Sequence, residues 1–166
     1  MNNKKRRFVC AFVNIILIFL VFILRYSGLC TFKIGEAVPN LLIPLALSIS
    51  VFYSNTAFLS AGLFIGILMD SAVTEASFFN SVYFVVGCSL CSVLATRLLN
   101  RNLKAAMCLS LLMSFCYFFL RYLIFFAFKG VAVNYEYFVV YLIPSVVYTA
   151  VWFIPFYFLQ KKLTEI

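Results

Sequence analysis

The chain has 166 residues, of which 66% are hydrophobic and only 11% are charged. A soluble domain of this size needs far more charge to keep its surface hydrated, so the composition excludes a soluble globular protein. Thirteen Lys and Arg against five Asp and Glu give a formal net charge of +8. Such an excess arises from a nucleic-acid-binding face or from cations gathered on one side of a membrane. Here the cations cluster between apolar runs, which favours the membrane and argues against nucleic-acid binding.

Six apolar runs follow one another along the chain, most of them near the length of about twenty residues that crosses a bilayer. They predict one all-α integral membrane domain, residues 1–166, with spans at about 8–24, 38–53, 56–71, 78–96, 105–128 and 137–159. The first run follows a basic head but lacks a small-residue cleavage pattern, so we expect it to remain as a helix. Only the four residues SNTA separate the second run from the third. A tight helical hairpin is favoured there, because one continuous helix would overshoot the bilayer.

The distribution of cations predicts the direction of the spans. Nine of the thirteen Lys and Arg lie at the N-terminus, in the connection after the fourth run and at the C-terminus, which share one side of a six-span chain. The connections on the other side hold three cations together with three of the acids, Glu36, Glu75 and Glu136. Because cytoplasmic loops carry the excess of Lys and Arg, we expect both termini in the cytoplasm.

Four prolines mark positions where the predicted helices begin or bend. Pro39 suits the first turn of the second span, where a helix does not use its backbone N–H. Pro44, Pro144 and Pro155 fall inside predicted spans, where each removes a helical hydrogen bond. We therefore expect these three prolines to bend their helices.

The third run contains the segment GLFIGILMDS, in which Gly62, Gly66 and Asp70 recur at a spacing of four. Residues four apart share one face of an α-helix, so the three form a single stripe. Helices in lipid associate through close packing, and small residues permit it. The stripe predicts that a neighbouring helix approaches closely at Gly62 and Gly66; the alternative is that glycine is simply frequent in membrane helices.

Asp70 and Arg121 are ionisable groups inside predicted spans, which makes both candidate functional residues. At 1.5 Å per residue, Asp70 lies about 21 Å along its helix and Arg121 about 24 Å along the fifth, and both helices run outward. An unpaired arginine in a membrane costs roughly 2.5–3.5 kcal/mol on insertion scales. We therefore predict that the two side chains meet, directly or through water, in the outer half of the bundle. The alternative is that Arg121 extends to the headgroups while Asp70 lies at the interface.

Catalytic and metal-binding patterns are missing from the sequence. There is no histidine, no pair of carboxylates within one span and no phosphate-binding glycine loop, so we predict no enzyme activity, catalytic residue, metal or cofactor. The spacing of Cys88 and Cys91 is that of a metal or redox pair, but it has no second pair. We expect the cysteines of the apolar runs to act as small buried hydrophobes. We expect Asn14, Asn80 and the serines of the fourth and fifth spans to bond across helices rather than to bind substrate.

Residues 38–101 resemble the rod shape-determining MreD family of bacteria. The resemblance comprises a proline-led second span, a tight hairpin, the stripe of Gly62, Gly66 and Asp70, and a fourth span that closes on TRLLNRNLK. It implies a multi-pass protein of the bacterial inner (plasma) membrane and a non-enzymatic role as a scaffold subunit of the complex that inserts peptidoglycan along the side wall. The implied partners are an MreC-like periplasmic coiled-coil protein, an MreB-like cytoskeletal protein, and a RodA-like glycosyltransferase with its transpeptidase.

The MreD family is also similar in fold to the S components of energy-coupling-factor vitamin transporters. The resemblance therefore implies an S-component-like bundle, and it supplies an alternative function in which the chain binds a small vitamin in an outward-facing pocket. The first span, FVCAFVNIILIFLVFIL, lacks the repeated small residues through which an S component docks on its transporter partner. This favours the scaffold over the transporter subunit.

Overall fold

The computed structural model describes residues 3–27, 39–53, 56–72, 78–97, 103–124 and 137–165. Within these ranges the chain is all-helical and has no β-strand. The elements are α1 (Asn3–Tyr26), α2 (Leu42–Phe52), α3 (Thr56–Ala72), α4 (Phe79–Arg97), α5 (Leu103–Tyr122), the π-helical turn η2 (Tyr137–Leu142), α6 (Ile143–Val151) and α7 (Phe153–Glu165). Each apolar run of the sequence thus contains helix. The bounds of α3 and α4 agree with the predicted spans to within one residue, whereas α1 begins at residue 3 rather than 8, α2 at 42 rather than 38, and α7 ends at 165 rather than 159.

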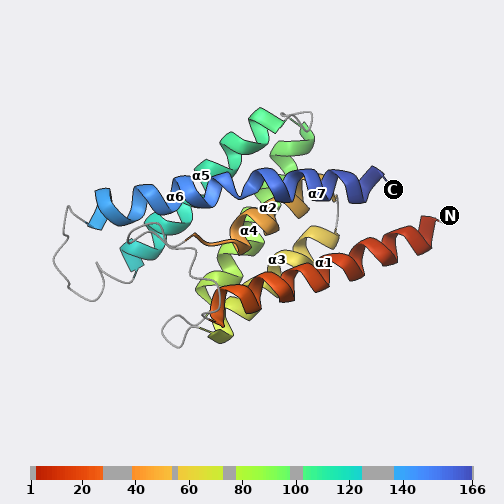
Figure 1. Cartoon of the computed structure of the whole chain (residues 1–166), viewed down its shortest axis with the longest axis horizontal. Helices are drawn as coiled ribbons and strands as arrows, with labels where there is room; N and C mark the ends of the chain where they lie inside the picture. The colour runs from red at the N-terminus through yellow and green to blue at the C-terminus, as the bar shows by residue number, and fades with distance from the viewer. Residues whose placement is uncertain are drawn as a thin grey trace.

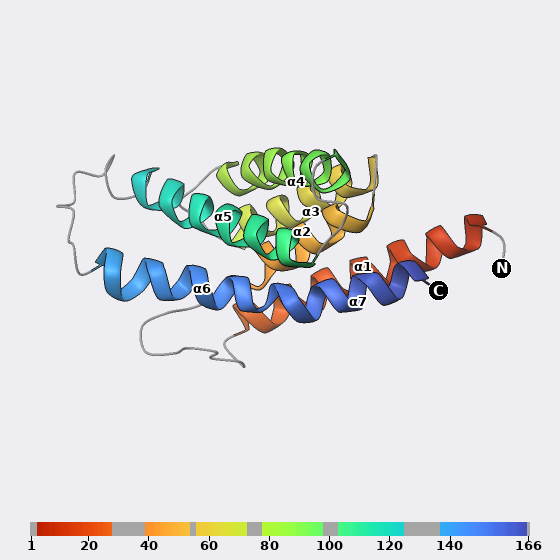
Figure 2. The same ribbon diagram turned by 90° about the horizontal axis from the view of Figure 1, so that it is seen from above.

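The short helix α2 forms the centre of the molecule. Every residue from Leu42 to Val51 is buried, and α2 contacts each of the other α-helices. Figure 2 shows α1 and the rod formed by α6 and α7 on one side of the molecule, with α3, α4 and α5 on the other. The N- and C-terminal ends lie at the same end of the molecule (Figure 1). A helix buried on all sides needs apolar residues all round, which the sequence of α2 supplies.

The start of α2 differs from the prediction. The second span was expected from residue 38 with Pro39 in its first turn, but Pro39 and Asn40 are not helical and α2 begins at Leu42. The Pro39 carbonyl accepts a hydrogen bond from Arg25 Nη1 at 2.6 Å, and the Asn40 N–H donates to Thr149 Oγ1 at 3.1 Å. These contacts with α1 and α6 hold the segment outside the helix. Pro44 consequently lies in the first turn of α2, so the prediction that it bends the interior of the second span is wrong.

The second and third runs are separate helices. α2 ends at Phe52 because Tyr53 adopts an extended conformation with φ −101° and ψ 120°, and α3 begins at Thr56. α2 and α3 also contact each other, as two helices of a hairpin do. One continuous helix through both runs is therefore excluded, although residues 54 and 55 themselves lie outside the described ranges.

The last predicted span is interrupted next to both of its prolines. Pro144 follows the π-helical turn η2 at the start of α6, and Pro155 lies in the first turn of α7 after a break at Trp152. In each case the proline cannot donate a hydrogen bond to the preceding turn. The segments nevertheless continue in the same general direction, so residues 137–165 form one long interrupted rod (Figure 1).

Three helical stretches are long and apolar enough to cross a membrane: Phe8–Tyr26, Leu103–Tyr122 and Val140–Thr164. Three shorter apolar helices, Leu42–Phe52, Leu59–Ala72 and Phe79–Ala95, accompany them. At 1.5 Å per residue, α2 is only about 16 Å long, roughly half the thickness of a hydrocarbon core. The protein therefore has the helices of a membrane protein.

The outward faces of the helices are strongly apolar. On α1, Phe8 and Phe12 are more than half exposed, and on α4 the same is true of Val82, Val86 and Leu90. Large apolar side chains are accommodated in such numbers only by lipid or by another protein. These surfaces fit the membrane environment that the composition predicts.

Candidate functional site

Asp70 caps the start of the neighbouring helix α4. Its carboxylate lies in the last turn of α3, where Oδ1 accepts hydrogen bonds from the Asn80 backbone N–H at 3.0 Å and from Asn80 Nδ2 at 2.9 Å. Oδ2 accepts from the Ser81 backbone N–H at 2.9 Å and from the Ser81 hydroxyl. The first N–H groups of a helix have no acceptor within it, and a negative charge there is stabilised by the helix dipole. Asp70 is thus a cap supplied by a different helix.

The residue before α4 explains why the cap comes from elsewhere. Phe78 precedes the helix, and its side chain has no oxygen to accept from the first turn. Phe78 also has a φ of 65°, in the left-handed region that side chains other than glycine rarely adopt. The residue before α4 therefore supplies no side-chain acceptor for the first N–H groups of the helix, and the carboxylate of Asp70 accepts from them instead.

The glycines of the stripe bring α3 into contact with the same place on α4. A Cβ atom on Gly66 would lie 2.9 Å from the Ser81 nitrogen and 3.1 Å from the Asn80 carbonyl carbon. A Cβ on Gly62 would lie 3.0 Å from Cys88 Sγ and 3.1 Å from the Phe84 oxygen. Gly62, Gly66 and Asp70 therefore all face α4, and the backbone that excludes a side chain at Gly66 is the backbone that Asp70 caps.

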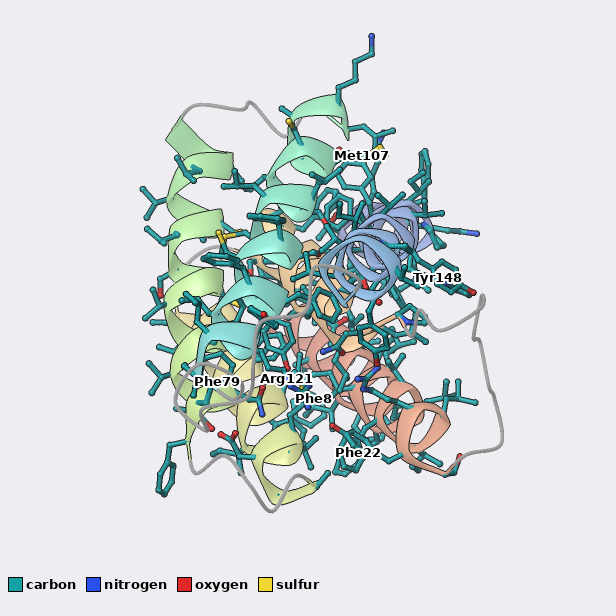
Figure 3. The ribbon with its side chains drawn as sticks, turned by 90° about the vertical axis from the view of Figure 1, so that its left-hand side faces the viewer. Phe8, Phe22, Phe79, Met107, Arg121 and Tyr148 are labelled. Atoms are coloured by element: carbon teal, nitrogen blue, oxygen red, sulfur yellow. The ribbon has the colours of Figure 1, made fainter. Side chains whose placement is uncertain are left out.

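A chain of hydrogen bonds links this junction to α5. The hydroxyl of Tyr117, which is fully buried, donates to Asn80 Oδ1 at 2.8 Å, while Asn80 Nδ2 donates to Asp70. Arg121 lies one turn beyond Tyr117 on α5, and its guanidinium acts electrostatically on the Tyr117 hydroxyl. Figure 3, which looks at the end of the molecule opposite the termini, shows Arg121 near the middle of this end. Arg25 of α1 acts on the same hydroxyl.

Asp70 and Arg121, the two charges predicted as a site, are connected through the side chains of Asn80 and Tyr117. Asp70 and Arg121 lie at the same end of the bundle, and the four hydrogen bonds described for Asp70 come from Asn80 and Ser81. A direct meeting of the two charges stays a prediction. Tyr117 was missed at the sequence level, although its position four residues before Arg121 places both on one face of the helix.

At the end that holds the termini, a second pair of polar side chains joins α1 to α7. Gln160 is fully buried, and its Nε2 donates to Asn14 Oδ1 at 2.6 Å. Cys10 Sγ, one turn earlier on α1, donates to the Leu163 carbonyl at 3.4 Å. The cross-helix hydrogen bonds expected of Asn14 and Asn80 are thus both present, although the partner Gln160 was not foreseen. Among the serines covered by the same prediction, Ser81 bonds across to Asp70, but Ser89 bonds within its own helix, and the buried hydroxyls of Ser110 and Ser114 have no partner in the described part of the chain.

The cysteines of the described residues are free thiols. Cys10, Cys88 and Cys91 are buried, as expected of small hydrophobes, but Cys108 is exposed, in contrast to that expectation, and Cys116 is half-buried. Cys88 packs beside Gly62 at the contact of α3 with α4. No cluster of three or more Cys, Asp or Glu that could hold a metal ion occurs in the part of the chain that the structure describes.

Comparison of the chain with protein-family models, with curated proteins and with solved structures finds no match.

Proposed function

We propose that the chain is a non-enzymatic scaffold subunit of the bacterial cell-wall elongation complex, supporting lateral peptidoglycan synthesis and control of cell shape. The proposal rests on the resemblance of residues 38–101 to the MreD family. The observation that carries the proposal concerns the stripe that resembles this family. Gly62, Gly66 and Asp70 all contact α4 and hold α3 and α4 together. A polar group that caps a neighbouring helix has an architectural role, as expected of a scaffold.

We further propose six crossings of the plasma membrane with both termini in the cytoplasm. The common location of the termini at one end of the molecule supports an even number of crossings (Figure 1). The cations at the N-terminus, after α4 and at the C-terminus support the direction. Reporter fusions after residues 35, 100 and 166 test this, because the first must report the periplasm and the other two the cytoplasm. Any other pattern contradicts the arrangement.

Docking to other membrane subunits follows from the exposed apolar faces of α1 and α4. In this mechanism the contact of α3 with α4 keeps the bundle rigid, and the outward faces bind an MreC-like protein, a RodA-like glycosyltransferase and its transpeptidase, with an MreB-like protein on the cytoplasmic side. Rigidity matters because a preorganised surface loses less entropy on binding.

The test is depletion of the chain in its own rod-shaped host, together with affinity purification from native membranes. Loss of rod shape and co-purification of a periplasmic coiled-coil protein are expected. Gly66→Leu should impair both, since the α4 backbone leaves no room for a side chain there. Ile67→Leu is the matched control, because Ile67 is the next residue and is half exposed. Normal shape after depletion contradicts the proposal.

The alternative is the substrate-binding S component of an energy-coupling-factor vitamin transporter. The observation that favours it is the gathering of Arg25, Tyr117 and Arg121 at the end opposite the termini, where a ligand from outside would arrive. Tight binding of a vitamin to the purified chain, together with co-purification of a transporter ATPase module, favours this alternative. Binding of no vitamin and recovery of the coiled-coil protein favours the scaffold.

A further inference from the structure

The two helices that begin near the end opposite the termini differ in how their N-termini are satisfied. The N-terminus of α4 receives the carboxylate of Asp70. The N-terminus of α2 receives no capping hydrogen bond from the side chain of Leu41, and its first residue, Leu42, is fully buried. The Ile43 N–H donates to the Asn40 carbonyl at 3.2 Å and Pro44 has no N–H, so this helix start leaves few free donors. Its partial positive charge, however, lies in an apolar environment without a capping side chain.

A cation lies beside this uncapped helix start. Arg25 Nη1 donates to the carbonyl of Pro39, three residues before α2, at 2.6 Å. Its Nε is buried and has no hydrogen-bond acceptor among the described residues. A guanidinium next to the positive end of a helix dipole is unfavourable unless a negative charge is also present. The positive end of α2 and the Arg25 guanidinium therefore lie side by side, and an anion between them would be stabilised by both.

Asn40 provides an independent observation at the same place. It lies between Pro39 and the first turn of α2 and is 0% exposed, yet neither Oδ1 nor Nδ2 has a partner in the described part of the chain. Buried Ser48 and Ser50 bond to carbonyls of their own helix, and three other buried serines each leave one hydroxyl without a partner among the described residues: Ser110, Ser114 and Ser145. Asn40 differs from these three because both of its side-chain polar atoms are unpartnered within the described ranges. A buried amide without a partner is costly, so its presence indicates a polar group that binds there.

A second guanidinium belongs to the same cluster. Arg121 on α5 is one turn from Tyr117, and the charges of both Arg121 and Arg25 act on the Tyr117 hydroxyl, so the two cations belong to the same end of the bundle. Asp70 is the acid that the described residues place at this end, and its oxygens are bonded to the start of α4. Among the described residues, this end therefore holds two guanidinium groups and one carboxylate whose oxygens are already bonded; Glu36, Glu75 and Glu136 lie outside the described ranges.

We infer that this end of the bundle binds a phosphate group between Arg25 and Arg121, at the start of α2. The planar guanidinium fork matches the oxygens of phosphate, and helix starts within a membrane are used elsewhere to hold anionic groups. The phosphate is that of a lipid headgroup or of a free phosphate compound. The inference does not depend on the proposed function, since it follows from charges and orphaned polar atoms alone.

The experiment uses the full chain purified in an uncharged, phosphate-free detergent. Thermal unfolding, followed by the fluorescence of the single tryptophan, is measured against inorganic phosphate, phosphatidic acid and diacylglycerol. A ligand that binds only the folded state raises the melting temperature, and the stabilisation grows with the logarithm of its concentration above Kd. We expect such concentration-dependent stabilisation by phosphatidic acid but not by diacylglycerol, which has the same tails without the phosphate. Stabilisation by inorganic phosphate at equal ionic strength identifies a free compound as the source.

Two variants and a control locate the site. Arg25→Gln should weaken phosphate binding at least about tenfold, because it removes a charge-assisted contact. Lys104→Gln, the control, removes one exposed cation from the opposite end of α5 and should leave binding unchanged. Asn40→Leu should raise the melting temperature without ligand, since it removes an unpartnered buried amide, and should weaken binding.

The outcomes separate binding from folding. The site is supported if the phosphate ligand raises the melting temperature of the native chain and this rise is lost in Arg25→Gln and in the folded Asn40→Leu variant. If neither inorganic phosphate nor phosphatidic acid stabilises the native chain, or if Lys104→Gln weakens binding as much as Arg25→Gln does, the inference is wrong. Asn40→Leu also keeps the test decisive if Arg25→Gln fails to fold.

Discussion

Replacement of Gly66 by alanine is the smallest change that should break the junction between α3 and α4. The added methyl group would overlap the Ser81 Cα, and it would lie 2.9 Å from the Ser81 nitrogen and 3.1 Å from the Asn80 carbonyl carbon. Ordinary non-bonded contacts of carbon lie at about 3.5–4.0 Å. Because these neighbours are backbone atoms, no side chain can rotate away, and α4 must move by roughly 1 Å or more to remove the clash.

The same movement acts on the Asp70 cap. The hydrogen bonds from Asn80 and Ser81 to the carboxylate are 2.9–3.0 Å long, so a shift of this size takes them past the usual limit of about 3.2 Å. Overpacking costs about 1–3 kcal/mol and loss of a cap about 1 kcal/mol, against a gain of about 1 kcal/mol from replacing glycine in a helix. The net expectation for Gly66→Ala is a loss of about 1–3 kcal/mol in the free energy of unfolding.

The assay is reversible unfolding in mixed detergent micelles, followed by the fluorescence of Trp152, which is the only tryptophan. Two other glycines serve as graded controls. Gly62→Ala meets a cysteine side chain and a carbonyl oxygen at 3.0 and 3.1 Å and should cost less. Gly87→Ala meets the terminal methyl of Met113 at 2.8 Å, which can move aside, so we expect little loss or a small gain. If Gly66→Ala is no less stable than Gly87→Ala, the close approach of α3 and α4 does not contribute as argued.

Three further polar contacts are tested by substitution in the same unfolding assay. Asp70→Ala should lower the free energy of unfolding by about 1–2 kcal/mol because α4 loses its cap. Asp70→Asn keeps one acceptor oxygen and should lower it by less. Equal losses in the two variants would contradict the assignment of both oxygens. Tyr117→Phe should cost about 1 kcal/mol through the lost hydrogen bond to Asn80, and unchanged stability would show that this bond contributes nothing. A double-mutant cycle of Asn14→Leu and Gln160→Leu should give a coupling energy of about 0.6–1.7 kcal/mol, whereas zero coupling would refute a direct contact in the membrane-embedded state.

The class of protein and the positions of most helices follow from the sequence alone. Apolar runs and glycine and proline positions are local signals, so the bounds of α3 and α4 agree with the predicted spans to within one residue. The stripe of Gly62, Gly66 and Asp70 was visible because the helical period places residues four apart on one face. The sequence also indicated that Asn14 and Asn80 bond across helices.

The identity of each partner was decided by the tertiary structure. Periodicity shows that Asp70 and Gly66 share a face, but it does not show which helix covers that face, and α4 rather than α5 does so. The start of α2 was also beyond local signals, because Pro39 and Asn40 are held out of the helix by contacts with α1 and α6. In a chain composed mainly of interchangeable apolar side chains, the few polar atoms select their partners through the packing of helices distant in sequence. That packing is a property of the whole bundle and of no single segment.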